Sequence, residues 1–415
     1  MRSPIRSPRA RRSALAVASA LGCISVAFAI ASCATSNDEA TSANDDAAPA
    51  ADSASRDTST NNASDSSCEA GDASDASCTT TELSCAEADF CTVPTSVDVR
   101  YSLTAVWGTT PTDVWAIGSR GTIIRWTGAS WGSVPSKRTE TLRAIWGSSP
   151  SDVWIVAAMN VILHGTGSPD GSPAISLVGP IYPDDPTNWQ GKLLTSVWGA
   201  EGKVFVAGNQ LNSGSVWRHT APVVEDPDLA PYEWERAYQT CQQGPCLDIN
   251  GLWGASTSNI WIIGNHGTVL HSKSTDGGAD QWELSPSLAK ANLNGIWGSS
   301  ASDVWIVGDA GTIRHWTDDG TGHWAVIPPP TSENLHAVWG TGPTDVWTVG
   351  DAGTILHWDG DTWSTATATF PVGEKPRLNG VWGSSPYDVW VVGERGLALH
   401  FTGAKSGTGK RKGPR

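Results

Sequence analysis

The sequence has few of the apolar side chains that usually fill a protein core, and few basic ones. Its 415 residues include 2 Met, 5 Phe and 5 Tyr, and 27 Lys and Arg stand against 42 Asp and Glu, for a formal net charge of −15. This acidic balance argues against nucleic-acid binding, which needs a basic footprint. Histidines and cysteines at metal-ligand spacing, a phosphate-binding glycine loop and a Ser/His/Asp motif are also missing. We therefore expect no metal, no cofactor and no enzyme of those classes.

A hydrophobic run long enough to span a membrane is also missing. The apolar stretch over residues 14–30 is short and follows five arginines, which is typical of a secretory signal. It ends at Ile30-Ala31-Ser32-Cys33, which resembles the lipobox of bacterial lipoproteins. By that resemblance, residues 1–33 are a signal peptide and the lipidated Cys33 anchors the chain to a lipid membrane; the alternative is an ordinary cleaved signal with an incidental cysteine. We expect an exported protein in the periplasm or at the cell surface, with the outer membrane as its expected location.

Residues 34–84 contain almost no large apolar side chain. From residue 34 to residue 89 there are 13 acidic residues and one basic one, Arg56, so most of the net charge lies here. Such a segment buries too little apolar surface to offset the entropy of ordering, and its charges repel one another. We expect a disordered acidic tether over 34–84 and a short basic, disordered tail over 404–415.

Tryptophan, by contrast, is abundant and regularly placed. The chain has 23 tryptophans, and a pattern close to L-x-A-V-W-G, D-V-W-x-V-G, G-T-I-L-H-W and a further Trp recurs seven times. The first Trp of each repeat is 39 to 55 residues from the next. Repeats of this length with several short strands are typical of a β-propeller, in which each repeat is one blade. We predict an all-β, seven-bladed propeller of four-stranded antiparallel blades over residues 85–403.

The fifth repeat illustrates the expected blade. Strands are predicted over 293–297, 303–307 and 312–316, and Trp324 opens the outermost strand. We assign six tryptophans to this outermost slot, among them Trp189 in the second blade. The seventh repeat lacks an outermost strand, whereas residues 90–93 match that slot in sequence. We therefore predict that this N-terminal segment completes the last blade and closes the ring.

Without Cys23 of the signal and Cys33, six cysteines remain. An even number in an exported chain suggests disulfides, and six cysteines allow 15 pairings. The short separations make Cys85 with Cys91 and Cys241 with Cys246 the simplest candidate pairs.

The turns before the outermost strands carry motifs such as Ser274-Thr275-Asp276-Gly277-Gly278 and Asp359-Gly360-Asp361-Thr362-Trp363. They resemble the Asp-box (BNR) turn of bacterial sialidases. The whole repeat is more similar to non-catalytic propellers of the photosystem II assembly and stability factor type, and to repeat lipoproteins of soil bacteria. The resemblance implies a fold and not an activity, because the Asp box lies away from the sialidase active site.

A sialidase-like site would need an arginine cluster, a Tyr paired with a Glu, and an acid. Of the five tyrosines, Tyr387 lies in a turn that by analogy is on the wrong face, and Tyr182 and Tyr232 lie in insertions. Tyr101 and Tyr238 lack an obvious acidic partner, so we expect no enzyme. Five histidines share one slot of the third strand, once per blade, and cannot converge on one ion. We expect them to make structural hydrogen bonds. We also expect the Asp that opens five of the second strands to bond its own turn; these are Asp113, Asp152, Asp303, Asp345 and Asp388.

Residues that depart from the repeat are the better candidates for function, because propellers bind ligands through their loops. By the topology of the propellers that the repeat resembles, the hairpins between second and third strands and the loop from Cys241 to Cys246 share the face that usually binds ligands. The candidate binding residues there are Arg120, Asn265, Asp309, Asp351, Glu394, Arg395, Gln242 and Gln243. We expect a protein or glycan partner. The alternatives are a sialidase-like glycoside hydrolase and a stability or assembly factor for a membrane complex.

Overall fold

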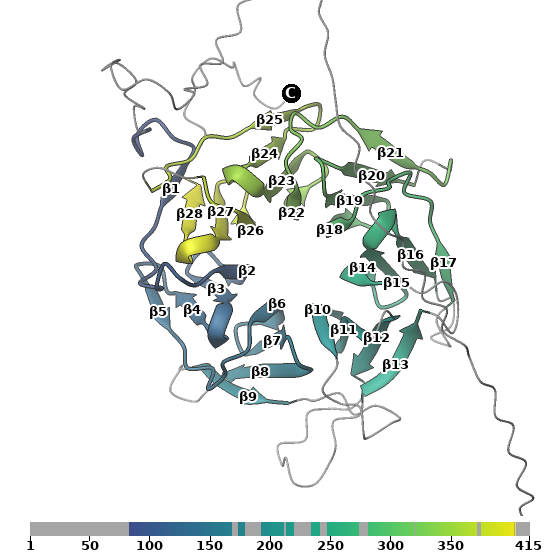
Figure 1. Cartoon of the computed structure of the whole chain (residues 1–415), viewed down its shortest axis with the longest axis horizontal. Helices are drawn as coiled ribbons and strands as arrows, with labels where there is room; N and C mark the ends of the chain where they lie inside the picture. The colour runs from purple at the N-terminus through teal and green to yellow at the C-terminus, as the bar shows by residue number, and fades with distance from the viewer. Residues whose placement is uncertain are drawn as a thin grey trace, which may run out of the picture. The chain divides into compact units, whose positions relative to one another are not determined.

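Each tryptophan-containing repeat folds as one antiparallel sheet, and the seven sheets surround a central axis (Figure 1). The computed structural model describes residues 83–167, 173–178, 192–210, 213–219, 234–240, 247–273, 281–318, 320–371, 375–401 and 403. Within these residues every sheet has four strands, which confirms the predicted seven-bladed propeller. No helix in these ranges is long and apolar enough to cross a bilayer.

Each blade presents the same order of strands from the centre outward. The innermost strands are β2 (Leu103–Thr110), β6 (Leu142–Ser149), β10 (Leu193–Ala200), β14 (Ile249–Ser256), β18 (Leu293–Ser300), β22 (Leu335–Gly342) and β26 (Leu378–Ser385). The second strands are β3 (Asp113–Gly118), β7 (Asp152–Ala157), β11 (Lys203–Gln210), β15 (Asn259–Gly264), β19 (Asp303–Gly308), β23 (Asp345–Gly350) and β27 (Asp388–Gly393).

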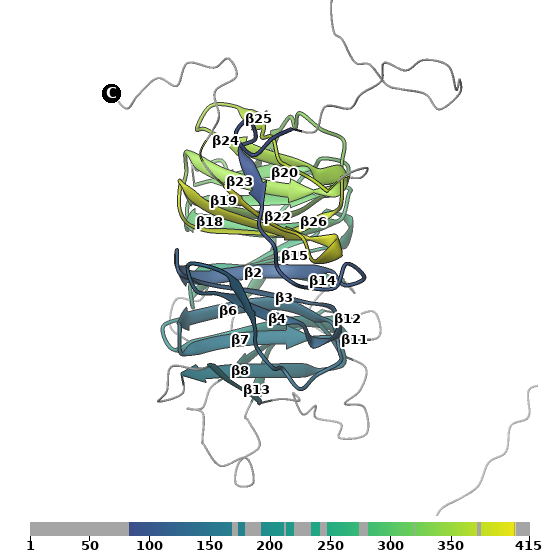
Figure 2. The same cartoon turned by 90° about the vertical axis from the view of Figure 1, so that its left-hand side faces the viewer.

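The outer half of each blade is shorter. The third strands are β4 (Ile123–Trp126), β8 (Val161–Gly167), β12 (Ser213–His219), β16 (Val269–Lys273), β20 (Ile313–Thr317), β24 (Ile355–Trp358) and β28 (Ala398–Phe401). The outermost strands are β5 (Trp131–Ser133), β9 (Pro173–Leu177), β13 (Trp234–Gln239), β17 (Trp282–Leu284), β21 (Trp324–Ile327), β25 (Trp363–Thr365) and β1 (Phe90–Thr92). Figure 2 shows the blades from the side, with their strands running across the thickness of the ring.

The second strands are buried on both faces because each sheet is packed between two others. All six residues of β3 and of β19 are buried, so these strands read as nearly continuous apolar runs rather than alternating ones. Their tryptophans form the centres of the contacts between blades. Trp261, for example, lies 5.2 Å from the rings of both Trp316 and Trp324 of the next blade. These aromatic contacts supply the buried area that Met and Phe supply elsewhere.

A second set of contacts joins the blades near the axis. The first-strand Trp of each blade lies against the Gly that follows the first-strand Trp of the next blade. A Cβ added to Gly147 would lie 2.5 Å from Cη2 of Trp107. The same contact occurs at all seven junctions: Trp107 with Gly147, Trp146 with Gly199, Trp198 with Gly254, Trp253 with Gly298, Trp297 with Gly340, Trp339 with Gly383, and Trp382 with Gly108. We call this set the Trp–Gly ring.

The last blade takes its outermost strand from the beginning of the chain. β1 pairs antiparallel with β28, with Phe90 opposite Phe401, so the strand predicted over residues 90–93 lies in the predicted place. Phe90 is fully buried, 5.3 Å from the ring of Trp347. Beyond β1, the Thr95 hydroxyl donates a hydrogen bond to the Gly396 carbonyl at 2.7 Å. Cys85 and Cys91, one of the candidate pairs, form a disulfide beside β1.

The prediction for the outermost strand of the second blade is wrong. That strand is β9, Pro173–Leu177, and Trp189 lies outside the described residues. The reason is local: Gly165 occupies the third-strand position where other blades have Trp316 or Trp358, and the Ile175 side chain fills the space that this glycine leaves. The chain therefore returns along β8 immediately, before it reaches the tryptophan.

Candidate functional site

The aspartate that opens the second strand anchors a hydrogen-bonded group in four blades. In the fifth blade the Ser299 hydroxyl and His315 Nε2 both bond the Asp303 carboxylate, and the His315 ring stacks on Trp305 at 3.8 Å. Equivalent groups are Ser148, Asp152, His164 and Trp154; Thr341, Asp345, His357 and Trp347; and Ser384, Asp388, His400 and Trp390. The histidines therefore serve the structure of their own blades, as we expected. Among the described residues no group of His, Cys, Asp or Glu could hold a metal ion.

These groups make the stability of the propeller sensitive to acid. Burial raises the pKa of the Asp303, Asp345 and Asp388 carboxyls, but hydrogen bonds from His and from Ser or Thr outweigh it, so each pKa lies below the ordinary value of 3.8. Because each carboxyl has a lower pKa in the folded than in the unfolded chain, it stabilises the folded state at any pH above the ordinary pKa. This stabilisation is lost as the pH falls from the ordinary pKa through the folded-state pKa. We expect the melting temperature to fall steadily below about pH 4. Calorimetry from pH 7 to pH 3 measures the melting temperature at each pH. In the variant Asp303→Asn the melting temperature should depend less steeply on pH. An unchanged slope in that variant would show that Asp303 does not contribute to the acid sensitivity.

The hairpins between second and third strands form one face of the ring, which we call the hairpin face. Four of them contain a 3₁₀ turn: η1 (Ser119–Gly121), η2 (Asn265–Gly267), η3 (Asp351–Gly353) and η4 (Glu394–Gly396). Each turn has two successive residues of positive φ, such as Arg395 at 59° and Gly396 at 65°. The glycine accepts this conformation easily, and the residue before it is held with its side chain on the exposed face.

The structure divides the candidate residues on this face into two groups. Asp309 accepts hydrogen bonds from Asn292 and Asn294, and Asp351 accepts them from Asn334 and His336. Asn265 is likewise bonded, to Asp248 and Asn250. These three are half-buried turn residues that brace the start of the innermost strands. Of the three acidic candidates, Asp309, Asp351 and Glu394, only Glu394 is therefore an exposed side chain.

The exposed group is mostly basic. Arg120, Arg143, Arg377 and Arg395 are exposed on the hairpin face over the seventh, first and second blades. The turn η4 packs against β2 and the turn η1 against β6, so the ring closure places residues of the two chain ends side by side. Arg120 also lies 5.9 Å from the ring of Tyr101. We call these four residues the arginine arc.

Sequence reasoning found Arg120 and Arg395 and missed the other two. Arg143 stands at the innermost-strand position where other blades have Asn250 or Asn294, and that departure from the repeat was a usable signal. Arg377 Nη2 lies 3.3 Å from His336 Nδ1, across the junction of the sixth and seventh blades. The remaining candidates, Gln242 and Gln243 with the pair Cys241 and Cys246, lie outside the described residues.

The described residues offer no sialidase-like arrangement. Tyr238 is buried against Trp282, with burial raising the pKa of its hydroxyl, and Tyr387 is exposed on the opposite face. Tyr101 lies beside Arg120, but in the ranges that the structure describes no hydrogen bond joins a tyrosine hydroxyl to a carboxylate. A nucleophilic Tyr–Glu pair is thus not formed there. In the turn before Trp363, Asp359 accepts hydrogen bonds from the backbone of Asp361 and Thr362.

No family model and no curated protein matches the sequence. Solved propellers do match the structure. YCF48 bound to a D1 peptide superposes with a TM-score of 0.55 at 17% identity, covering 76% of this chain and 96% of its own. YCF48 from Cyanidioschyzon merolae gives 0.55 at 16%, covering 76% and 99%. The WD40 propeller domain of Doa1 gives 0.52 at 13%, covering 77% and 97%. At these identities the likeness shows the fold.

Proposed function

We propose that this protein is an exported, lipid-anchored propeller that binds a protein partner through its hairpin face and does not catalyse a reaction. The observation that carries the proposal is the arginine arc: exposed guanidinium groups gathered on one face of a chain that is acidic overall. Guanidinium groups suit the paired recognition of carboxylates, so the partner is expected to present an acidic segment. The YCF48 structure with a bound D1 peptide supports peptide binding by a propeller of this shape.

Charge reversal in the arc tests this proposal. The double variant Arg120→Glu/Arg395→Glu should reduce crosslinking of a partner to the hairpin face by about a hundredfold or more, since each of the two charged contacts contributes on the order of 1.5–3 kcal/mol. The measurement is quantitative photocrosslinking in intact cells from a probe at position 310, whose residue is exposed on the same face. Tyr387→Glu is the matched control, because Tyr387 is 72% exposed in a turn at the opposite ends of the strands. Equal loss in both variants would show that the arc is not the binding surface.

The anchor at Cys33 is the second part of the proposal. It rests on the lipobox-like sequence and on the acidic segment that separates Cys33 from the propeller, whose length suits capture at a distance from the membrane. Cys33→Ser should abolish metabolic labelling with a radioactive fatty acid and move the protein from the membrane fraction to the soluble fraction. Full labelling of the variant would disprove lipidation at this residue.

Three alternatives remain testable. A glycan in place of a protein would bind the wild-type chain on a glycan array, with affinity lost in the arginine variant. A glycoside hydrolase would turn over fluorogenic substrates, and activity abolished at Arg120 or Glu394 would replace our proposal by an enzyme. A stability or assembly factor for a membrane complex is a special case of protein binding, recognised when the crosslinked partner is a subunit of such a complex.

A further inference from the structure

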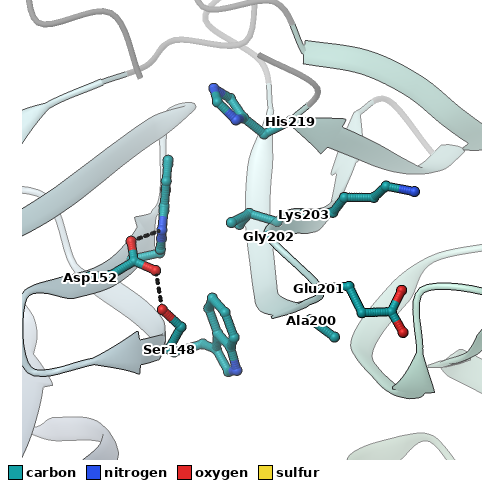
Figure 3. Close-up of a pocket in the computed structure, with 10 residues that line it drawn as sticks. Ser148, Asp152, Ala200, Glu201, Gly202, Lys203 and His219 are labelled. Atoms are coloured by element: carbon teal, nitrogen blue, oxygen red, sulfur yellow. Dashed lines mark hydrogen bonds between the residues drawn. The ribbon is translucent and has the colours of Figure 1, made fainter. Parts of the chain in front are cut away.

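A cavity of about 230 Å³ lies between the second and third blades, at the ends of the strands opposite the hairpin face. Trp146, Ser148, Asp152 and Trp154 of the second blade line one side, and Ala200, Glu201, Gly202, Lys203, Val204 and His219 of the third blade line the other (Figure 3). The volume is below the roughly 300–1,000 Å³ of sites for drug-sized ligands. It suits one side chain or a fragment of that size.

The cavity exists because the third blade departs from the repeat here. At four other junctions the second-strand Trp is covered by two large aromatic rings of the next blade, as Trp305 is by Trp358 and Trp363. Trp154 is covered by Trp234 and by the smaller imidazole of His219. Gly202 and Lys203 stand where the fifth blade has Ser302 and Asp303, at the start of the second strand. Small side chains, together with a lysine that points away, leave the space open.

The carboxylate of Asp152 is more accessible than its equivalents. Its side chain is 35% exposed, against 10% for Asp303, 16% for Asp345 and 14% for Asp388. Figure 3 shows Asp152 facing the cavity, with the side chains of Glu201 and Lys203 directed away from it. Asp152 is therefore the charged group that the interior of the cavity presents.

The hydrogen bonds of Asp152 limit what it can still accept. Oδ1 accepts from His164 Nε2 at 2.7 Å and from Trp154 Nε1 at 2.8 Å, which occupies both of its lone pairs. Oδ2 accepts from the Ser148 hydroxyl, and no other donor to it occurs among the described residues. One acceptor position on an anionic oxygen remains, in a cavity that the half-buried Trp146 also lines.

We propose that this cavity binds a primary ammonium group on an alkyl stem, as a lysine side chain of a partner protein presents it. The ammonium would donate to Oδ2 of Asp152 while its stem lies against Trp146, an arrangement in which hydrogen bond, charge and cation–π attraction act together. An ammonium needs a single acceptor position, whereas the fork of a guanidinium needs two parallel ones. An anion is excluded by the carboxylate. The site lies on the face opposite the arginine arc and is independent of it.

The test uses the full-length chain and three small probes: N-acetyl-lysine methylamide, its Nε-acetylated form, and N-acetyl-arginine methylamide. Saturation-transfer NMR at pH 8, where ordinary histidines are neutral, should show the lysine probe binding with a Kd of about 1–10 mM. The neutral probe should not bind, and the arginine probe should bind about tenfold more weakly. No binding of the lysine probe, or equal binding of the arginine probe, would overturn the proposal.

Two variants locate the site. Asp152→Asn should weaken lysine-probe binding about tenfold, whereas Asp345→Asn, the buried equivalent in the sixth blade, should leave it unchanged. His219→Trp restores the ring found at Trp316 and Trp358, so it should fill the cavity, raise the melting temperature by about 2–4 °C and abolish binding. Because His219→Trp is expected to stabilise the protein, it decides the matter even if Asp152→Asn does not fold. A stabilised His219→Trp variant that still binds the probe would refute the site, and the arginine-arc variant should bind the probe normally.

Discussion

Deleting residues 85–97 is expected to lower the melting temperature by more than about 10 °C. The deletion removes β1 and with it the fully buried Phe90, which contacts the rings of Trp347 and Phe401. Loss of a buried Phe alone costs about 3–5 kcal/mol, and the deletion also exposes the edge of β28. The seventh blade would then have three strands, and its junction with the sixth blade would lose part of its core. Differential scanning calorimetry of the deletion variant checks this.

A single substitution separates the packing effect from the deletion itself. Phe90→Ala should account for a large part of the destabilisation, about 3–5 kcal/mol by chemical denaturation. Val99→Ala is the control, because Val99, just after the deleted segment, is 70% exposed and should change stability by less than about 0.5 kcal/mol. If the deletion variant melted at the temperature of the parent, β1 would not be the strand that closes the ring.

Gly340→Ala is expected to destabilise the propeller by about 3 kcal/mol or more, whereas Gly342→Ala in the same strand should have almost no effect. A Cβ on Gly340 would lie 2.4 Å from the backbone oxygen of Asp345 and 2.9 Å from Cη2 of Trp297. Neither neighbour can retreat, since one is backbone within the sheet and the other is wedged between blades. A Cβ on Gly342 meets nothing within 4 Å.

The two alanine variants share a strand, a residue type and a change in unfolded-chain entropy, so their difference isolates the contact with Trp297 and the backbone. Denaturant titration followed by tryptophan fluorescence gives both free energies of unfolding. If the two variants were equally stable, the Trp–Gly ring would not be a constraint on the fold. A second substitution, Trp297→Phe, should partly rescue Gly340→Ala by shortening the ring that the new methyl group meets.

The fold could be predicted from the sequence because the repeat places the same side chain in the same environment seven times. Trp297, Trp305 and Trp324 each represent a slot, and a slot filled by one residue type in most blades is set by packing between neighbours. The prediction failed at Trp189 because it relied on the slot and ignored Gly165. A glycine where other blades have an indole changes which following segment can pack beside it. That choice depends on the space around the glycine in the folded blade, which the repeat pattern does not show.

The candidate site was less accessible to sequence reasoning. The arginine arc combines Arg120 and Arg395 from two hairpins, Arg143 from an innermost strand and Arg377 from the connection before β26. These are three different slots, so no periodicity links them, and only the ring closure brings them to one face. The cavity beside Asp152 arises in the same way, from small residues of one blade facing a carboxylate of another. The sequence shows that Lys203 and His219 depart from the repeat, but it does not show that both residues line the same cavity.

The pairing of β1 with β28 has a consequence for how the chain is made. The Thr95 hydroxyl and the Gly396 carbonyl that it bonds are 301 residues apart. The strand β1 is therefore synthesised early but cannot pair until β28, near the other end of the propeller sequence, has been synthesised. Until then, indole-rich sheet faces lack a neighbour, and contacts of such long sequence separation form slowly. If the chain is exported, as we propose, it would have to be held unfolded during translocation and would complete its ring in one late step on the far side of the membrane.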